Sequence, residues 1–416
     1  MNSGSGRSAA QRALELSTRV SFNGLAEAPE RGFSLITHWN QQYGLCHVHL
    51  ADDGGYALAS PPVGLIVFWW LGRPVAHRWC ADGGSEPLAG QIDSHVLELI
   101  AAEEQRAGAA QLGASVVICT RDRPDQLRRC LASLPQQTWQ AREVIVVDNA
   151  SIGRRTRDVA HEAGAIYLRE ERPGLDFARN TGARAASSPI LAYTDDDVLL
   201  HPTWLERLVA AFDTPTVAAV TGLVLPAELA TDAQEHFEKH WSFGRGYLRQ
   251  DFDTARFAQH RVDVFPAWEI GAGASMAFRR EIFERIGYFD ERLDVGQAGC
   301  SGDSEFWYRV LAHGLSCRYE PRAVAFHVHR RTLDGLASQI HHYMRGHAVA
   351  LLVQWERTGI AANRRQAWLG MPRWYAGRLW HRLRGLCRPQ DRFLREEVLG
   401  YLSGLLFYLR HRREGS

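Results

Sequence analysis

The sequence lacks several features that would assign it to a class at once. Its seven cysteines contain no CxxC spacing and are odd in number, so neither a zinc site nor a disulfide framework is indicated. The longest apolar runs, 63–71 and 398–409, fall well short of the roughly 20 residues that span a bilayer. The N-terminus lacks a basic segment followed by an apolar stretch, so we expect no signal peptide. These absences favour a protein with buried thiols in a reducing cytoplasm.

The chain also has almost no net charge, since 48 basic and 47 acidic residues leave +1. No overall field therefore favours nucleic acid or another polyanion as a partner. The distribution is uneven, because residues 330–416 carry 16 arginines and 6 acidic residues, a balance of +10 against −9 for the rest. The 416 residues are enough for an enzymatic core with smaller additions. The sequence therefore predicts an acidic body with a basic tail over residues 331–416.

Residues 1–112 predict a small N-terminal accessory domain. The apolar run over 64–71 is followed by Gly72, Arg73 and Pro74, which indicates a strand that turns into a second strand. A helix is expected next, with an apolar side formed by Ile92, Val96, Leu97, Leu99 and Ile100. We find no combination of catalytic side chains in this region.

From Ala114 onward, short apolar strands alternate with amphipathic helices. The predicted strands cover residues 115–119, 143–147, 166–168, 190–194 and 217–225. Pro124 opens one helix, and another is expected over 203–212. Strands separated by helices predict an α/β fold for residues 113–330, with a doubly wound and mainly parallel sheet.

Polar residues follow three of these strands at their carboxyl ends. They are Thr120, Arg121 and Arg123 after the first strand, Asp148 and Asn149 after the second, and Asp195, Asp196 and Asp197 after the fourth. Ligands of such sheets bind beyond the carboxyl ends of the strands. Three adjacent carboxylates repel one another, so they normally persist where a cation compensates their charge. The pattern predicts a metal site at this edge of the sheet; turn and helix-capping residues in a solvated loop are the alternative.

Six short motifs give this region a resemblance to a known enzyme family. They are VVICTRDR at 116–123, VVDNAS at 146–151, GLDFARNTG at 174–182, YTDDD at 193–197, GAGASM at 271–276 and GDSEF at 302–306. In this order and at these separations, the chain resembles the family 2 glycosyltransferases, which are inverting enzymes built on the GT-A nucleotide-binding fold. The resemblance covers residues 114–330 and indicates the fold and the type of reaction, but not the sugar.

The resemblance implies roles for individual residues. It implies a nucleotide site formed by Thr120, Arg121, Arg123, Asp148, Arg179, Asp195 and Asp196. Asp195 and Asp197 form the DxD motif of the family, through which Mn²⁺ or Mg²⁺ bridges the donor diphosphate. Asp303 is implied as the catalytic base. The implied acceptor site consists of Trp268, Glu269, Gly271, Gly273 and Glu305.

Some of these positions leave alternatives open. The residue before the base is acidic in the usual pattern but is Gly302 here, and Glu305 is a second candidate for the base. Asp303 is also placed to cap the helix that is expected after it. His327 and His329 both follow an apolar run, and we expect His327 to be an additional metal ligand that favours manganese. Two histidines facing solvent at a strand end are the alternative.

The basic tail has helical spacing. Its last apolar face consists of Val398, Leu402, Leu405, Leu406 and Leu409, followed by basic residues. An amphipathic helix of this kind suits the surface of an anionic membrane, which would hold a cytoplasmic protein peripherally on the inner face of the plasma membrane. A helix packed on the catalytic domain, with its arginines in water, is the alternative.

These observations predict a metal-dependent inverting glycosyltransferase. The expected partners are a nucleotide-sugar donor and a glycan or lipid-linked acceptor, as in the synthesis of cell-surface polysaccharides or glycolipids. A sugar-1-phosphate nucleotidyltransferase could share the sheet and the acidic cluster, although we find no glycine-rich loop suited to an attacked triphosphate. A catalytically inactive glycan-binding subunit is a third hypothesis, against which the intact acidic and basic residues argue.

Overall fold

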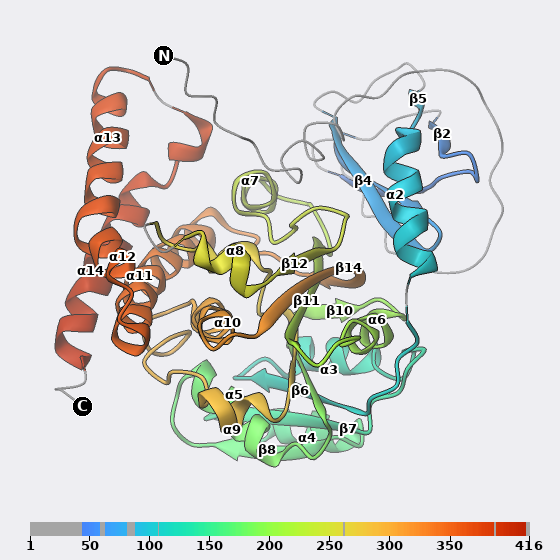
Figure 1. Ribbon diagram of the computed structural model, residues 1–416, viewed down its shortest axis with the longest axis horizontal. Coiled ribbons are helices and arrows are strands. Elements are labelled where there is room, and N and C mark those ends of the chain that lie inside the picture. The colour runs from blue at the N-terminus through green and yellow to red at the C-terminus, as the bar shows by residue number, and fades with distance from the viewer. Residues whose placement is uncertain are drawn as a thin grey trace.

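The computed structural model describes residues 44–58, 63–80, 88–106, 108–260, 263–386 and 388–412. Figure 1 shows three parts: a small N-terminal domain of strands and one helix, a central α/β domain, and a group of C-terminal helices on the opposite side from the N-terminal domain. The stretch on which we based the expectation of no signal peptide lies outside the described residues.

The N-terminal domain has two small sheets and one helix. Its elements are β1 (Leu45–His49), β2 (Gly55–Leu58), β3 (Gly64–Trp70), β4 (Arg73–Cys80), β5 (Leu88–Gln91) and α2 (Ser94–Gln105). β3 pairs in parallel with β1 and antiparallel with β4, while β2 and β5 form a separate antiparallel pair. The predicted turn between β3 and β4 is confirmed, with positive φ at Leu71 and Gly72. The predicted helix is confirmed, with Leu97 and Ile100 buried, but Leu99 is exposed and Ile92 lies before the helix, so these two residues were wrongly placed on its apolar side.

Strand β3 is buried on both faces, which fixes the small domain to the central one. Leu65, Val67 and Trp69 join the core of the α/β domain, whereas Ile66 and Phe68 join the core of the small domain. This alternation follows from the two-residue period of a strand. The Trp69 ring also stacks on His201 of the α/β domain, with 5.4 Å between the ring centroids. The N-terminal domain is therefore packed directly on the α/β domain through β3.

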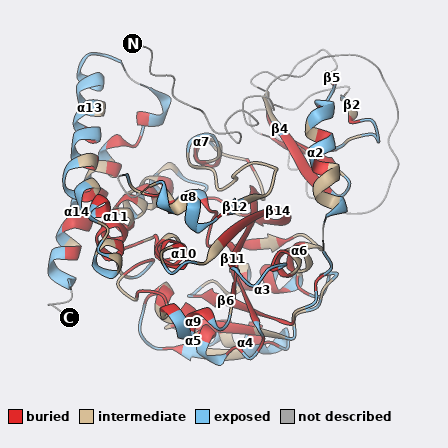
Figure 2. Ribbon diagram, viewed as in Figure 1, coloured by how far each residue is buried: buried red, intermediate tan, exposed pale blue. Residues whose placement is uncertain are grey.

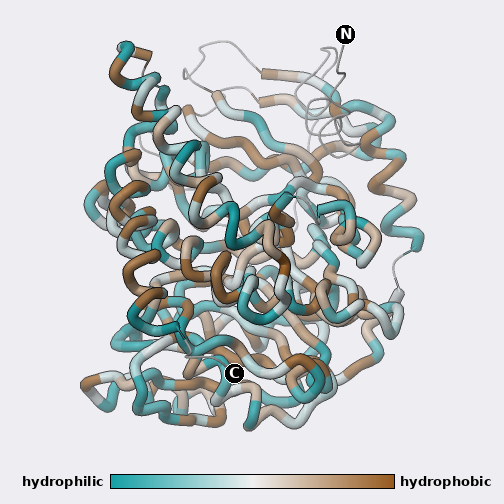
Figure 3. Tube along the Cα trace, turned by 60° about the vertical axis from the view of Figure 1, so that its left-hand side comes forward, coloured by the Kyte–Doolittle hydropathy of each residue, from teal (hydrophilic) through white to brown (hydrophobic). Residues whose placement is uncertain are grey.

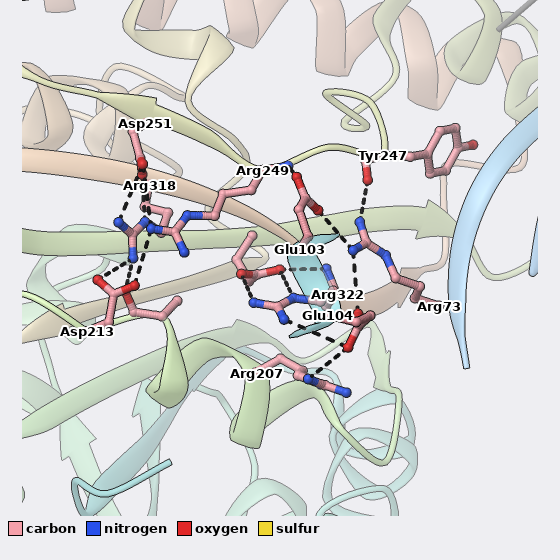
Figure 4. Close-up of polar contacts among 12 residues, drawn as sticks. Arg73, Glu103, Glu104, Arg207, Asp213, Tyr247, Arg249, Asp251, Arg318 and Arg322 are labelled. Atoms are coloured by element: carbon pink, nitrogen blue, oxygen red, sulfur yellow. Dashed lines mark hydrogen bonds and ion pairs between the residues drawn. The ribbon is translucent and has the colours of Figure 1, made fainter. Parts of the chain in front are cut away.

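Ion pairs hold α2 against the central sheet (Figure 4). Arg73 is almost fully buried and donates to Glu103 at 2.9 Å and to the backbone oxygen of Tyr247. Glu104 lies 3.3 Å from Arg207 and 3.9 Å from Arg322. Because leaving one member of a buried charge pair unpartnered is costly, such a network favours a single orientation of the two domains.

The central sheet is mainly parallel and has nine strands within the described residues. They are β6 (Ala114–Thr120), β7 (Glu143–Asn149), β8 (Ile166–Glu170), β9 (Ile190–Asp195), β10 (Val198–Leu200), β11 (Val217–Pro226), β12 (Gln250–Phe252), β13 (Ser275–Arg279) and β14 (Ser316–His327). The order is β10-β14-β11-β13-β9-β6-β7-β8, with β12 beside β14. β8, β7, β6 and β9 are parallel, and β13 is antiparallel between β9 and β11. The predicted mainly parallel α/β sheet is confirmed.

Helices cover both faces of this sheet. They are α3 (Pro124–Ala132), α4 (Arg155–Glu162), α5 (Leu175–Ala185), α6 (Trp204–Ala210), α7 (Asp232–Trp241), α8 (Thr254–Ala258), α9 (Ile282–Ile286) and α10 (Gly302–Ala312), with the short 3-10 turn η1 (Ala267–Glu269). Neighbouring residues of β6 enter different cores: Val117 packs with Ala178 of α5, and Val116 packs with Leu127 of α3. The strands are therefore buried on both sides, as Figure 2 shows in red.

The C-terminal part is entirely helical where it is described. It contains α11 (Leu333–Thr358), α12 (Ala361–Arg365), the π-helical turn η2 (Gln366–Gly370), α13 (Met371–Leu383), the 3-10 turn η3 (Pro389–Asp391) and α14 (Leu394–His411). α14 lies directly against α11 at two glycines. A Cβ at Gly400 would lie 2.1 Å from the backbone oxygen of His341, and one at Gly404 would lie 2.3 Å from that of Arg345. Only residues without a side chain allow this approach.

Part of the predicted apolar face of α14 is buried, and part of it is exposed. Leu405 packs against α11, whereas Leu402, Leu406 and Leu409 are 49%, 56% and 46% exposed. α13 is largely exposed as well (Figure 2), and hydrophobic and hydrophilic residues alternate along these helices in Figure 3. No helix within the described ranges is long and apolar enough to cross a membrane. The six described cysteines are free thiols, of which four are buried and two, Cys80 and Cys300, are partly exposed.

Candidate active site

A large cavity lies at the carboxyl edge of the sheet. Its volume is about 1310 Å³, and it is bounded on one side by strand-end residues that include Thr120, Arg123 and Asp195. The opposite side is formed by residues of the C-terminal helices, such as His347 of α11 and Trp374 of α13. The predicted position of the ligand site beyond the strand ends therefore coincides with a real cavity.

The acidic triplet divides between two environments. Asp195 ends β9, Asp197 follows it, and each of these side chains has one oxygen within 4.8 Å of the other and of a ring nitrogen of His327. Burial, together with the charge of Asp197, raises the pKa of Asp195 above its ordinary value. Two carboxylates and an imidazole this close together form a donor set that suits a divalent cation.

Asp196 is not part of this group, and hydrogen bonds hold both of its carboxylate oxygens. Its Oδ2 accepts a hydrogen bond from the Thr120 hydroxyl at 2.6 Å, and its Oδ1 accepts one from Arg123 at 3.1 Å. The same Arg123 nitrogen donates to Oδ2 of Asp197 at 3.1 Å. The ends of β6 and β9 are thereby joined, and one guanidinium neutralises part of the triplet's charge. Thr120 and Asp196 line the cavity, and their nucleotide role stays a prediction.

The two histidines after β14 differ in what they face. Nε2 of His327 lies 3.4 Å from Oδ1 of Asp197, so this ring belongs to the acidic group. Nε2 of His329 lies 3.0 Å from Glu238 of α7, and the Nδ1 atoms of the two histidines are 2.9 Å apart. Burial lowers the pKa of His327 to about 4, which leaves its ring neutral near pH 7. Neither ring faces bulk solvent, since both residues are buried.

Asp303 lies at the start of α10 and lines the cavity. Its Oδ2 accepts a hydrogen bond from the backbone N–H of Gly273 at 2.8 Å, and its Oδ1 accepts one from that of Ser304 at 2.6 Å. Burial and the charge of Asp294 raise the pKa of Asp303 above its ordinary value. Ser301, the residue before α10, has the uncommon φ of 77°, which turns the chain sharply into the helix. The geometry holds this carboxylate still and leaves it at the cavity wall.

Arg179 lies in the same wall and is surrounded by carboxylates. Its NH1 donates to Asp176 at 2.9 Å and to Asp294 at 2.6 Å. A Cβ at Gly302 would lie 2.0 Å from Oδ2 of Asp176, an oxygen that is buried without a hydrogen-bond partner. Asp176 thus brings a carboxylate to the place where a side chain at position 302 would begin. This accounts for glycine where the resemblance led us to expect an acid.

The structure brings some predicted site residues to the cavity and not others. Arg121, Trp268, Gly271 and Gly273 line it, together with the residues described above. Its described lining does not include Asp148, Glu269 or Glu305. Asp148 is fully buried and accepts hydrogen bonds from Tyr167 at 2.8 Å and from the backbone N–H of Ser151 at 3.0 Å. Glu305 is fully buried and accepts one from Arg309 at 2.7 Å.

Several lining residues were not predicted from the sequence. Some are charged, such as Arg245, Asp294 and Arg365, and others are aromatic or apolar: Trp241, Tyr343, Met344, Met371 and Trp374, with His347 beside them. The helical spacing of the tail was visible, but no short motif marks the side of each helix that turns toward the catalytic domain. Their contribution appears only once the C-terminal helices are placed beside the sheet.

Comparison with solved structures identifies the class of fold. A mannosyltransferase from Pyrobaculum calidifontis, solved with GDP-Man and Mn²⁺, superposes with a TM-score of 0.50 at 17% sequence identity. The match covers 77% of this chain and 95% of that one. At this level of identity the likeness concerns the fold alone. The central domain accordingly has the GT-A fold that the motifs predicted.

Sequence comparison then identifies the family. Residues 115–287 match the model of glycosyl transferase family 2. Glycosyltransferase AglE of Haloferax volcanii is 34% identical over 221 residues, which cover 51% of this chain and 66% of that protein. The pre-mycofactocin glycosyltransferase of Mycobacterium tuberculosis is 26% identical over 295 residues, which cover 69% of this chain and 57% of that protein. Residues 115–287 therefore form a family 2 glycosyltransferase domain, and the chain spans little more than half of the length of the mycobacterial relative.

Proposed function

We propose that this chain transfers a sugar, with inversion, from a nucleotide diphosphate donor to a hydroxyl of a glycan or lipid-linked acceptor, with the help of Mn²⁺ or Mg²⁺. The observation that carries the proposal is that the Asp195, Asp197 and His327 group and the Asp303 carboxylate line one cavity. A cation site alone could be structural, and a buried carboxylate alone could be a helix cap. Both together, in a cavity of a family 2 domain, support chemistry between two substrates.

The donor set fits the cation that this reaction requires. Asp195 and Asp197 supply hard oxygen ligands, and the neutral His327 ring supplies a nitrogen that Mn²⁺ accepts more readily than Mg²⁺. The bound cation would supply positive charge to the departing diphosphate. Arg123 and Arg121 line the same part of the cavity and add fixed positive charge near the phosphates.

Asp303 performs the proton transfer in this proposal. As the acceptor oxygen forms its bond to the anomeric carbon, the bond from that carbon to the diphosphate oxygen breaks, and its electron pair leaves with the diphosphate. The acceptor proton passes to Asp303. The N–H groups of Gly273 and Ser304 hold the carboxylate, so that little reorganisation is needed when the acceptor arrives. The raised pKa of Asp303 strengthens it as a proton acceptor.

The other half of the cavity suits the acceptor. At about 1310 Å³ the cavity exceeds the roughly 300–1,000 Å³ of a site for one small molecule, so it has room for two substrates. Trp268, Trp241 and Trp374 line it from three different segments of the chain. Aromatic rings provide flat apolar surfaces for sugar faces or for the apolar part of a lipid-linked acceptor. We assign the C-terminal helices to acceptor binding on this basis.

The test is a product assay with a panel of sugar nucleotides. Release of a nucleoside diphosphate, with Mn²⁺ or Mg²⁺ and not with EDTA, is expected for one donor. A nucleotidyltransferase would instead form pyrophosphate from a nucleoside triphosphate, and an inactive glycan-binding subunit would release nothing. Asp197→Asn should abolish the metal-dependent release, because it removes a charge from the cation site. Asp125→Asn, at an exposed position on α3, is the matched control and should behave like the wild type.

Attachment to an anionic membrane is a separate part of the proposal. It is supported by the exposed leucines of α14 and by the +10 balance of the basic tail. Because α14 packs on α11, point substitutions test this better than truncation does. Leu402→Ser with Leu406→Ser should reduce sedimentation with phosphatidylglycerol vesicles, whereas Ile152→Ser, an exposed position far along the chain, should not. Binding should weaken with salt, and equal sedimentation of all variants would leave the exposed stripe without this role.

A further inference from the structure

His329 and Glu238 form a chain of contacts behind the metal ligand His327. Nδ1 of His327 lies 2.9 Å from Nδ1 of His329, and Nε2 of His329 lies 3.0 Å from Oε2 of Glu238. At its other end the chain reaches the acidic group, since Nε2 of His327 lies 3.4 Å from Oδ1 of Asp197. Each of the two imidazoles thus uses both of its nitrogens.

These contacts admit one consistent arrangement of protons for neutral rings. An ionised carboxylate can only accept hydrogen bonds, so Nε2 of His329 must carry a hydrogen toward Glu238. Nδ1 of His329 is then bare and accepts, so Nδ1 of His327 must donate to it. His327 is left with a bare Nε2, which faces the carboxylate of Asp197. Two electron-pair donors in that position repel each other unless a cation joins them.

The opposite arrangement of protons fails at the Glu238 end. If Nδ1 of His329 donated to His327, the bare Nε2 of His329 would face the Glu238 carboxylate without a proton between them. Nε2 of His327 would then carry a hydrogen and would be unable to bind a metal. The position of Glu238 therefore decides which nitrogen of His327 is free.

The surroundings keep this chain in place. Oε1 of Glu238 accepts a hydrogen bond from the Ser242 hydroxyl at 2.8 Å, so both carboxylate oxygens are engaged. Phe237 lies 4.6 Å and Phe243 lies 5.9 Å from the His329 ring, measured between centroids. The His329 side chain is 2% exposed and that of Glu238 is 9% exposed. Water has little access to replace either contact.

We infer that Glu238 and His329 are positioning residues that set the metal-binding tautomer of His327. The inference rests on the proposed function, because it assumes the cation site at Asp195, Asp197 and His327. It goes beyond that proposal by assigning a role to two residues of which neither lines the cavity. Partners of this kind typically change metal affinity by about 10–100-fold when they are lost.

The test measures Mn²⁺ binding to the full chain without donor, by the loss of the electron paramagnetic resonance signal of free Mn²⁺. His329→Phe retains an aromatic ring in its aromatic surroundings and removes the hydrogen-bonded connection between Glu238 and His327. It should raise the Mn²⁺ dissociation constant by about 10–100-fold. Glu238→Gln keeps an oxygen that can accept from His329 and should cause a smaller loss. Glu235→Gln, one turn earlier on α7 and paired with Lys239, controls for the helix charge and should change nothing.

Nitrogen-15 spectra of labelled histidines separate positioning from a merely structural effect. In the wild type, His327, assigned by its absence in His327→Asn, should show a protonated Nδ1 and a bare Nε2. In His329→Phe the form protonated at Nε2 should increase. Unchanged Mn²⁺ affinity in His329→Phe, or lower affinity with an unchanged His327 tautomer, would overturn the inference.

A further comparison distinguishes this inference from the proposed function. If Asp197→Asn weakens Mn²⁺ binding and His329→Phe does not, the proposed cation site is supported, and the positioning role of His329 and Glu238 is wrong. If Asp197→Asn leaves Mn²⁺ binding unchanged, the proposed cation site itself is wrong, and so is the positioning role of His329 and Glu238.

Discussion

The two halves of the cavity are built in different ways. The proposed donor half comes from residues at or within a few positions of strand ends, such as Thr120 at the end of β6 and Asp195 at the end of β9. The proposed acceptor half comes from separate segments, with Trp241 at the end of α7, His347 on α11 and Trp374 on α13. The residues of the first half therefore lie in short sequence motifs, whereas those of the second come together only through the packing of helices. A family motif search finds the chemistry and misses most of the acceptor surface.

The two proposed halves also differ in their balance of charged and aromatic side chains, although Arg365 of α12 lines the cavity as well. Carboxylates and guanidinium groups alternate in the donor half, where Arg123 contacts both Asp196 and Asp197. In the acceptor half, burial lowers the pKa of His347 to about 4, so this residue is neutral near pH 7 and lies against the Trp268 ring. Charged groups suit a diphosphate and its cation, and neutral aromatic groups suit sugar rings or apolar chains. The predictions that follow separate these two contributions.

The largest effect is expected at the boundary between the halves. Asp303→Asn should lower the rate of sugar transfer by at least about a hundredfold, because a general base contributes about 10²–10⁴. Donor binding should change little, since the carboxylate is assigned to the acceptor proton. Steady-state rates and calorimetric titration of the donor measure the two quantities. A parallel loss of donor affinity would instead assign Asp303 to the donor site.

An intermediate effect is expected in the acceptor half. Trp374→Ala should raise the KM for the acceptor on the order of tenfold, because an aromatic contact contributes about 0.5–1.5 kcal/mol beyond the area it buries. The KM for the donor should stay the same. Trp380→Ala is the matched control, since Trp380 lies on the same helix and is similarly exposed but is not among the described residues that line the cavity. Equal behaviour of the two variants would remove α13 from the acceptor site.

The smallest effect concerns pH. A raised pKa means that Asp303 keeps its proton to a higher pH than a free aspartic acid, so the rate should fall as the pH drops through this raised pKa. Asp294→Asn removes a negative charge near Asp303, which favours the ionised form and lowers the pKa. The acidic limb of kcat/KM should therefore move to lower pH in this variant. A limb that stays in place would show that another group controls it.

Sequence reasoning predicted the elements that have strong local signals. The strand ends at Thr120 and Asp195 were correct because the period of each apolar run and the polar residues after it are local properties. The grouping of Asp195 and Asp197 with His327 also followed from a motif and a strand end. The turn after Trp70 was predicted because Gly72 permits a positive φ.

The remainder depends on contacts between residues far apart in the chain. His329 and Glu238 meet although 91 positions separate them, and nothing near either residue indicates the other. Asp176 fills the space beside Gly302, so a departure from the family pattern at one position is explained by a carboxylate on another helix. The choice between a packed and an exposed α14 was undecidable from its pattern, because the helix is both.

The most direct test of the two-part cavity is a calorimetric titration with nucleoside diphosphates, with and without Mn²⁺. One nucleoside diphosphate should bind the wild type only when Mn²⁺ is present. Asp197→Asn should lose this binding, and Trp374→Ala should keep it, because the diphosphate occupies the donor half alone. Equal binding to the wild type and Asp197→Asn, or loss of binding in Trp374→Ala, would contradict the division of the cavity into a metal-dependent donor half and a helical acceptor half.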